Sequence, residues 1–433
     1  MPGAERMPIL VLGTMGNLDS RTSAQLEAMG VVGARILPPA VSAGYRLEIA
    51  LGASIAVIFL LAYFALVALV AWAVWSIAPR GRPPAGLFVI VVGGCLLFLS
   101  LLKPLVARPG RTAEPHSLDP DKGPLLFAFV RELASASGTP GPERIVVDCN
   151  VNCCCVFAGG IAGLFRSAPV LLVGLPLVSG LRLGELGGVV AHELAHSAQT
   201  KAMQSSRFLW GVHAWFSRVA LEPDKWDEQL LKWIESAGPI ASLASRLTQL
   251  LFRLGRGALG LLAVAEGAAV SIFLRRMELE ADRCQARVAG TGAFVSTALE
   301  INLLALAAQR AIVELSRMKR NGRLVDNYPG LIAAVRERYS KQFVQRVQSG
   351  LEARRTGWFG AHPSDNNRIA LAREENCPGI VTAGLPSAML FADYDALCRQ
   401  VTLEFYDQEF CLKRTSYELV PLQSIVDELE SVS

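Results

Sequence analysis

The sequence predicts an α+β fold, mainly α, in which an N-terminal transmembrane helical hairpin precedes a larger domain of helices with a small sheet. Hydrophobic residues make up 52% of the 433 residues and charged residues only 18%, whereas soluble globular domains contain about 25% charged residues. The longest uncharged stretches lie before residue 107, and the later chain shows mainly helical periodicity. These two observations favour a membrane protein over a soluble one.

Residues 49–77 form the first predicted membrane span, because they contain no charged residue and about 20 apolar residues suffice to cross a bilayer core. Tyr45 before this segment, and Trp72 and Trp75 near its end, suit the two membrane interfaces. A signal peptide does not explain the segment, because its apolar run is too long and a second one follows at once. We therefore expect a transmembrane helix here.

A second span is predicted from Ala85 to about Leu102, after a Pro- and Gly-containing loop at residues 78–84 that is typical of a turn between antiparallel helices. The two spans make a hairpin over residues 45–107, so we expect an integral, multi-pass membrane protein. Fewer basic residues lie in the loop than beside the outer ends of the hairpin: Arg80 and Arg82 against Arg35, Arg46, Lys103, Arg108 and Arg111. The positive-inside rule then places the rest of the chain on the cytoplasmic side.

Two histidines stand four residues apart in the segment His192-Glu193-Leu194-Ala195-His196. On a helix this spacing puts both imidazoles on one face, where they can bind one metal ion, with Glu193 beside the open coordination position. Zinc lowers the pKa of a bound water, and a neighbouring carboxylate can take its proton. The motif favours a zinc-dependent hydrolase, although the same letters also occur by chance on an ordinary amphipathic helix.

Glu278 is the best candidate for a third ligand, because a carboxylate is the usual partner of two helical histidines in such a site. Asp282 lies one helical turn beyond it, and we expect this carboxylate to accept a hydrogen bond from the metal-bound His192 and to orient its ring. The alternative is a solvated helix face on which these acidic residues pair with Arg275 and Arg276.

The combination of H-E-x-x-H with Glu278-Leu279-Glu280-Ala281-Asp282 resembles the membrane-embedded zinc metallopeptidases that include the CAAX prenyl protease and the bacterial stress protease HtpX. The resemblance covers residues 181–368 well and the region from residue 120 more loosely. It implies a zincin-like metallopeptidase domain with one zinc ion per chain, in which Glu278 is the third ligand and Asp282 supports a ligand.

The resemblance also extends to His362, which precedes a proline, and to Arg368 six residues later. These residues match the family's C-terminal His-Pro and Arg, and the resemblance implies that they help to bind substrate and to stabilise the transition state. A histidine before a proline, taken alone, is more often an ordinary loop residue.

The function we expect is a membrane-anchored zinc metalloendopeptidase that hydrolyses peptide bonds in membrane or unfolded proteins, as in quality control. Its partners are then a protein or peptide substrate and the lipid bilayer. Two alternatives stay open: a specialised processing protease for one peptide or lipidated tail, and a non-catalytic membrane scaffold that binds zinc structurally. Intact Glu193 weighs against the scaffold, because a structural site needs no base.

Nucleotide and nucleic-acid partners are not expected. Residues 255–260 spell a formal G-x-G-x-x-G, but no predicted strand precedes it and no βαβ unit surrounds it. The net charge of +4 is spread along the chain without interleaved aromatic residues.

The stretch between the two zinc motifs, residues 205–277, contains an apolar run at Gly257–Leu274 with Glu266 at its centre. A charge there is costly in hydrocarbon. A single crossing would also put His196 and Glu278 on opposite sides of the membrane. We expect no crossing, with these helices packed in the domain or lying along the membrane surface; two crossings are the alternative.

Two short segments before the histidine motif are predicted strands. Cys149 and Cys153-Cys154-Cys155 lack the paired spacing of a structural zinc site, so we interpret them as small buried strand residues. Nine cysteines, an odd and unevenly spaced set, also do not suggest a disulfide framework. Residues 169–173 predict a strand that either lies at a sheet edge, where it can receive an extended substrate, or lies in the core.

The chain divides into five predicted segments. These are a polar, poorly ordered tail at 1–44, the hairpin at 45–107, a linker at 108–123, the zinc metallopeptidase domain at 124–375 and a helical extension at 376–433 whose role the sequence does not reveal.

Overall fold

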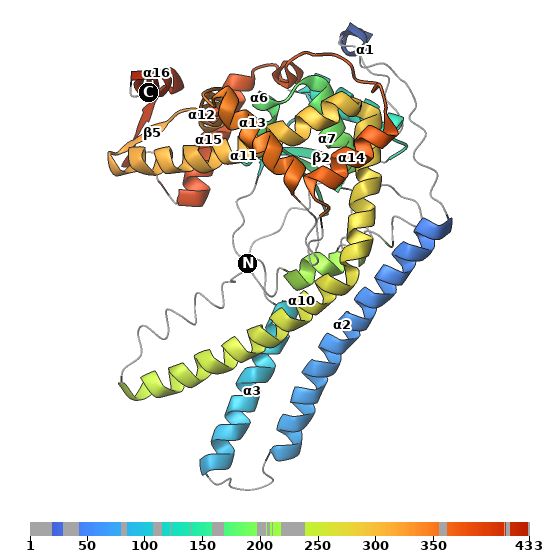
Figure 1. The fold of residues 1–433 in the computed structure, drawn as a ribbon. Helices are drawn as coiled ribbons and strands as arrows, with labels where there is room; N and C mark the ends of the chain where they lie inside the picture. Colours follow the sequence, from blue (N-terminus) through green and yellow to red (C-terminus); the bar gives the residue numbers. More distant parts are fainter. Residues whose placement is uncertain are drawn as a thin grey trace.

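The structure is a computed structural model that describes residues 20–28, 43–78, 85–106, 115–121, 123–139, 141–157, 169–196, 205, 208–209, 211–217, 239–354, 362–410, 412 and 416–431. These residues are mainly helical with a small sheet, which confirms the predicted α+β class. Figure 1 shows a compact part that holds the sheet, and a second part, here named the helical leg. The leg consists of α2 (Ala43–Ile77), α3 (Ala85–Val106) and the first half of α10 (Pro239–Ala289).

Three of the described helices are long and apolar enough to cross a membrane: α2, the Gln249–Ala289 part of α10, and α11 (Thr291–Arg320). α2 contains the span predicted at 49–77, and α3 contains a shorter apolar stretch, Val91–Leu102. α2 packs against α3. Away from α3, α2 exposes many large apolar side chains, which include Leu51, Ile58, Leu61, Phe64, Trp72 and Trp75. Such a surface suits lipid better than water.

α10 is one continuous helix of 51 residues. It packs against α2 and α3 in the leg, and against α7 (Leu183–His196) and α14 (Asp365–Glu375) in the compact part. We expected the helices of this region to pack in the domain or to lie along the membrane surface. The second half of α10 packs in the compact part as expected, whereas its first half packs against the equally apolar α2 and α3. The number of membrane crossings stays a prediction.

The sheet has the strand order β1-β2-β4-β3 within the described residues. Its strands are β1 (His116–Ser117), β2 (Arg144–Asp148), β3 (Cys153–Phe157) and β4 (Pro169–Gly174). β4 runs parallel to β2 and antiparallel to β3. β4 therefore lies inside the sheet, and of the two positions considered for residues 169–173 the core position is the one observed. Among the described strands the edge beside β4 is β3, which packs against α7.

One apolar core joins the sheet to the helices around it. α4 (Pro124–Ala136), α6 (Leu175–Gly180), α7 and α11 contribute fully buried side chains, which include Phe129, Leu175, Leu194 and Leu304. The other elements of the compact part are α12 (Tyr328–Glu337), α13 (Lys341–Ala353), η1 (Ser387–Leu390), α15 (Tyr394–Phe410), α16 (Leu422–Ser431) and the parallel pair β5 (Arg323–Val325) and β6 (Glu418–Val420).

Described residues of the predicted polar tail and of the predicted helical extension contribute to this core. In the tail, α1 (Ser20–Ala28) packs on α4 through Leu26, which is buried. In the extension, β6 adds to β5 and Tyr406 fills the core. Apolar side chains on short helices are buried only when distant segments provide the partner surface, and the sequence does not show that surface.

Tyr406 offers a test of this integration. The ring is fully buried and its hydroxyl donates a 2.9 Å hydrogen bond to the Val325 carbonyl. We expect Tyr406→Ala to lower the free energy of unfolding by about 3–5 kcal/mol, as for other large-to-small core changes, and Tyr406→Phe by about 1 kcal/mol for the lost hydrogen bond. Denaturant titration of the detergent-solubilised protein measures both. Equal small effects would mean that residues 377–433 are a separable cap.

Candidate metal centre

α7 carries the two histidines and is held in place by its buried apolar face. Leu186, Val190 and Leu194 recur at helical spacing and are almost completely buried. Gly188 allows α10 to approach closely, because a Cβ at this position would lie 2.7 Å from the Cβ of Ala289. The second half of α10 therefore lies directly against the helix that bears the histidines.

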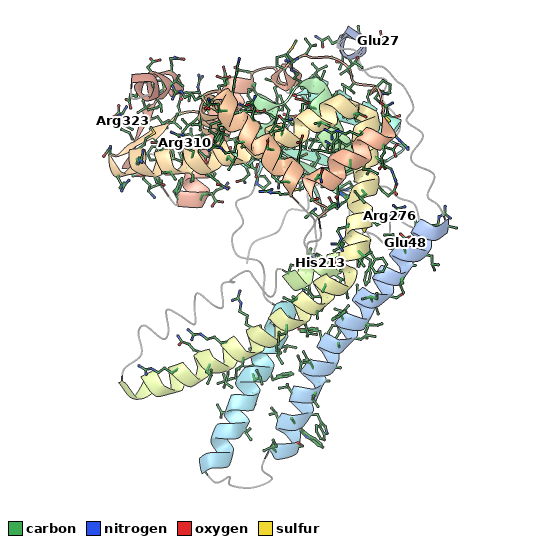
Figure 2. All side chains as sticks on the ribbon, viewed as in Figure 1. Glu27, Glu48, His213, Arg276, Arg310 and Arg323 are labelled. Carbon is green, nitrogen blue, oxygen red and sulfur yellow. The ribbon has the colours of Figure 1, made fainter. Side chains whose placement is uncertain are left out.

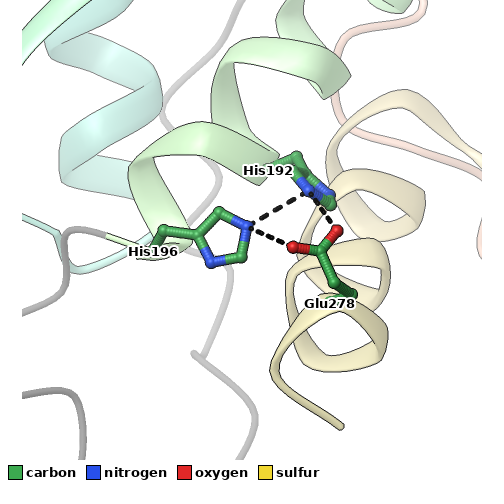
Figure 3. Close-up of side chains that lie close together, drawn as sticks. All are labelled: His192, His196 and Glu278. Atoms are coloured by element: carbon green, nitrogen blue, oxygen red, sulfur yellow. Dashed lines mark hydrogen bonds and ion pairs between the residues drawn. The ribbon is translucent and has the colours of Figure 1, made fainter. Parts of the chain in front are cut away.

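Three side chains converge between these two helices, as Figure 3 shows. Nε2 of His192 lies 3.3 Å from Nε2 of His196. In the carboxylate of Glu278, on α10, Oε2 lies 3.6 Å from Nε2 of His192 and Oε1 lies 3.6 Å from Nε2 of His196. His192 and Glu278 are buried, and His196 is partly exposed. The three ligand atoms lie within 4.8 Å of one another, the arrangement that one metal ion requires.

The donor set fits zinc. In a tetrahedral site with bonds of about 2.0–2.2 Å, neighbouring ligand atoms are about 3.3–3.6 Å apart. The 3.3 Å separation of the two histidine nitrogens falls in this range, and so do the 3.6 Å distances from Oε2 of Glu278 to His192 and from Oε1 of Glu278 to His196. Two imidazole nitrogens that face each other at this distance also need a proton or a cation between them, because their lone pairs repel.

Asp282 lies behind His192, on the side away from Glu278. Its Oδ1 is 3.2 Å from Nδ1 of His192, and its side chain is fully buried. Arg368, on α14, donates to both oxygens of Asp282, from Nε at 2.9 Å and from Nη2 at 2.6 Å. The expected contact between Asp282 and His192 is therefore present. The sequence did not indicate the pairing of Arg368 with Asp282, because nothing in the local pattern connects residues 86 positions apart.

His362 lies at the exposed rim of the site. Its Nδ1 is 3.1 Å from Oε2 of Glu278, while 68% of its side chain is accessible. Ser364 caps α14 by accepting a hydrogen bond from the Asn367 amide, which fixes the helix start three residues beyond His362. His362 and Arg368 thus lie in the same group of contacts as the two histidines, Glu278 and Asp282.

Glu193 lies on α7 next to the two histidines and touches the edge strand. Its Oε2 accepts a 3.3 Å hydrogen bond from the Cys155 amide. Cys153 is buried and Cys154 and Cys155 are partly exposed, as small residues of a strand that covers the helix. No local sequence pattern indicates this contact between β3 and Glu193, because it joins residues 38 positions apart.

The pKa values in the metal-free site follow from burial and neighbouring charge. Burial lowers the pKa of His192, but the hydrogen bonds and charges of Asp282 and Glu278 outweigh it and raise the pKa to about 10. Burial, together with the charge of His192, lowers the pKa of His196 to about 4. Burial raises the pKa of Glu193. For Asp282 burial raises the pKa, but Arg368 and His192 outweigh it and hold the pKa below its usual range.

The sequence pattern of peptidase family M48 matches residues 126–376, more than half of the chain. The chain belongs to peptidase family M48. M48 is the family of HtpX and the CAAX protease, so the resemblance seen in the sequence is confirmed. Membership makes the chain a protease of the metalloprotease class, and the M48 peptidases are zinc enzymes. No curated protein and no solved structure matches the chain.

Proposed function

We propose that this M48 peptidase is a membrane-anchored zinc metalloendopeptidase, with one zinc ion held by His192, His196 and Glu278. The observation that carries the proposal is the convergence of these three ligand atoms within 4.8 Å, on two packed helices. Zinc held there supplies a Lewis acid and lowers the pKa of the attacking water.

Glu193 is the general base in this proposal. Burial raises the pKa of its carboxyl, which brings its proton affinity closer to what a base needs at neutral pH. Its Oε2 accepts a hydrogen bond from the Cys155 amide, which holds the carboxylate in place. In this proposal the carboxylate takes the proton of the water and passes it to the leaving amine.

His362 and Arg368 have different roles. His362, exposed at the rim, can donate a hydrogen bond to the developing oxyanion. Arg368 directs two donors at Asp282, which faces Nδ1 of His192. This chain of contacts fixes the ring orientation of His192 and leaves its Nε2 for the metal.

The substrate in this proposal is an extended peptide. Of the two edge strands among the described strands, β1 and β3, it is β3 that adjoins Glu193, so a peptide can add to β3 by backbone hydrogen bonds next to the proposed base. Backbone recognition reads little sequence, which favours unfolded or membrane proteins, and hence quality control, over one dedicated substrate.

The helical leg is the membrane anchor in this proposal. α2, α3 and the first half of α10 pack together and extend away from the compact part, which faces the cytoplasm by the distribution of basic residues. His196 and Glu278 meet in one site, so they lie on the same side of the bilayer. If the first half of α10 lies inside the bilayer, the chain between these two residues crosses the membrane twice. That is the alternative to the zero crossings expected from the sequence.

The full-length protein in detergent or lipid nanodiscs tests the proposed activity. One equivalent of zinc, cleavage of an unfolded protein at several internal bonds, loss of cleavage on chelation and recovery on adding zinc support it. Zinc bound without cleavage indicates the scaffold. Cleavage restricted to one site in a peptide or lipidated tail indicates the processing protease.

Zinc affinity should rise with pH. His192 has a pKa of about 10 in the metal-free protein and must lose its proton to bind, so the affinity should rise about tenfold per unit between about pH 7 and that pKa. His196, with a pKa of about 4, adds no proton in this range. Chelator competition, corrected for the chelator's own protonation, measures the slope. A flat profile would show that Asp282 and Glu278 do not hold His192 protonated.

The same pKa shift makes the folding stability of the metal-free protein depend on pH, and this stability falls with rising pH whereas the zinc affinity rises. A folded-state pKa above the unfolded value contributes stability that is fully present below about pH 6.5. That contribution should be lost as the pH rises toward about 10, the folded-state pKa of His192.

A further inference from the structure

A buried ion pair lies in the helical leg, away from the metal centre. Glu266, on α10, is completely inaccessible, and its Oε2 lies 2.8 Å from Nδ1 of His213, in the helical segment at residues 211–217. Figure 2 shows His213 beside the middle of α10. Among the described residues, the second oxygen of Glu266 accepts no hydrogen bond.

The surroundings of the pair are apolar. The cluster that fills this part of the leg is formed by α2, α10, one residue of α3 and the residues around His213, and includes Ile49, Leu101, Leu209, Val212, Phe216 and Val270. A carboxylate in such a place loses its hydration, and apolar side chains of similar volume usually pack there at no loss of stability. Packing alone therefore does not account for a glutamate and a histidine at these positions. A hydrogen bond fixes the relative position of two groups more narrowly than apolar contacts do, because it has a preferred length and direction.

The pair joins the same two stretches of chain that build the metal centre. His213 follows His196 by 17 residues, and Glu266 precedes Glu278 by 12 residues on the uninterrupted α10. Twelve residues of α-helix span about 18 Å. The two stretches therefore contact each other at two places, at the metal centre and in the leg, and α10 runs without interruption from one place to the other.

Gly267 shows that this contact also sets how closely the ring approaches α10. A Cβ at this position would lie 3.2 Å from Cε1 of His213, so the imidazole rests against the backbone of α10. A shift of α10 by one residue would move Glu278 by about 1.5 Å and turn it by about 100°. Either change exceeds what the 3.6 Å separations to His192 and His196 tolerate.

We propose that His213 and Glu266 are a positioning pair for the metal centre: their hydrogen bond fixes the height and rotation of α10 and so places Glu278 against His192 and His196. The inference rests on the proposed zinc site and adds two residues, outside that site, on which its metal affinity depends.

Four variants of the full-length protein test the pair. Glu266→Gln keeps an oxygen that can accept the His213 hydrogen bond. Glu266→Leu removes the acceptor, and the double variant His213→Leu/Glu266→Leu removes both polar groups. His116→Leu/Glu404→Leu is the matched control, because it removes a partly exposed pair of the same type, with a 2.9 Å contact, from the compact part.

The measurements are the zinc dissociation constant by chelator competition, kcat and KM at saturating zinc, and thermal stability. We expect Glu266→Leu and the double leucine variant to weaken zinc binding about 10- to 100-fold, the range for groups that orient ligands. kcat should fall with KM little changed, because β3 is untouched. Glu266→Gln and the His116/Glu404 control should stay close to wild type.

The double leucine variant separates positioning from stability. It leaves no buried polar group unpaired, so its thermal stability should recover relative to Glu266→Leu, while its zinc affinity stays low. A double variant with wild-type zinc affinity and kcat would overturn the inference. Wild-type protein that binds no zinc would overturn the proposed function and this inference with it. Tight wild-type binding that no variant weakens would overturn the inference alone.

Discussion

Glu193→Gln is expected to lower kcat for peptide hydrolysis by about 10²–10⁴-fold, the contribution of a positioned acid–base group, while zinc stays bound. Glutamine has the same shape, and its carbonyl oxygen can accept the hydrogen bond that Oε2 of Glu193 accepts from the Cys155 amide. The amide cannot take a proton from the attacking water. Removal of the base should therefore leave the ligands and the edge strand in place.

The experiment compares the two proteins at equal zinc content, with cleavage of an unfolded protein as the readout. KM should change little, because the variant leaves β3, the proposed binding strand, unchanged. Glu185→Gln is a matched control on the same helix: Glu185 accepts hydrogen bonds from the Arg182 amide and from Ser296, away from the metal centre. Equal cleavage by wild type and Glu193→Gln would remove Glu193 from the mechanism.

The residues of the candidate site could be found from the sequence because their spacing on helices is local. His192 and His196 are one turn apart, and so are Glu278 and Asp282. A helix converts that spacing into a shared face whatever the rest of the fold does. The contact between Arg368 and Asp282 joins distant segments, so no local pattern indicates it.

The edge strand of the sheet and the packing of α10 could not be predicted for the same reason, because both depend on contacts with segments distant in the sequence. β3 and β4 are both short apolar strands, and only their pairing decides which one lies inside. In α10, Glu266 argued against a membrane span, because a charge is costly in hydrocarbon. The structure supplies His213 as its partner, from a segment whose position relative to α10 the sequence does not give.

Glu278→Gln is expected to weaken zinc binding by more than about 100-fold, beyond the loss seen for groups that only orient a ligand, and to abolish cleavage. The carboxylate faces His192 with Oε2 and His196 with Oε1, each oxygen 3.6 Å from the Nε2 atom of its histidine, and it supplies negative charge to the site. An amide offers one neutral oxygen in its place. The pKa of His192 should also fall, because the charge and hydrogen bond of Glu278 help to raise it.

Glu280→Gln is the matched control for this variant, because it lies on the same helix two residues further on. Its carboxylate pairs with Arg283 and Arg276, which are partly exposed, and not with the histidines. Such pairs contribute at most about 1 kcal/mol, so zinc affinity and activity should stay near wild type. Equal losses in both variants would mean that the charge of α10 matters and Glu278 is no ligand. A loss confined to Glu278→Gln, together with a lower pH at which zinc binding saturates, would tie the carboxylate to the metal and to His192 at once.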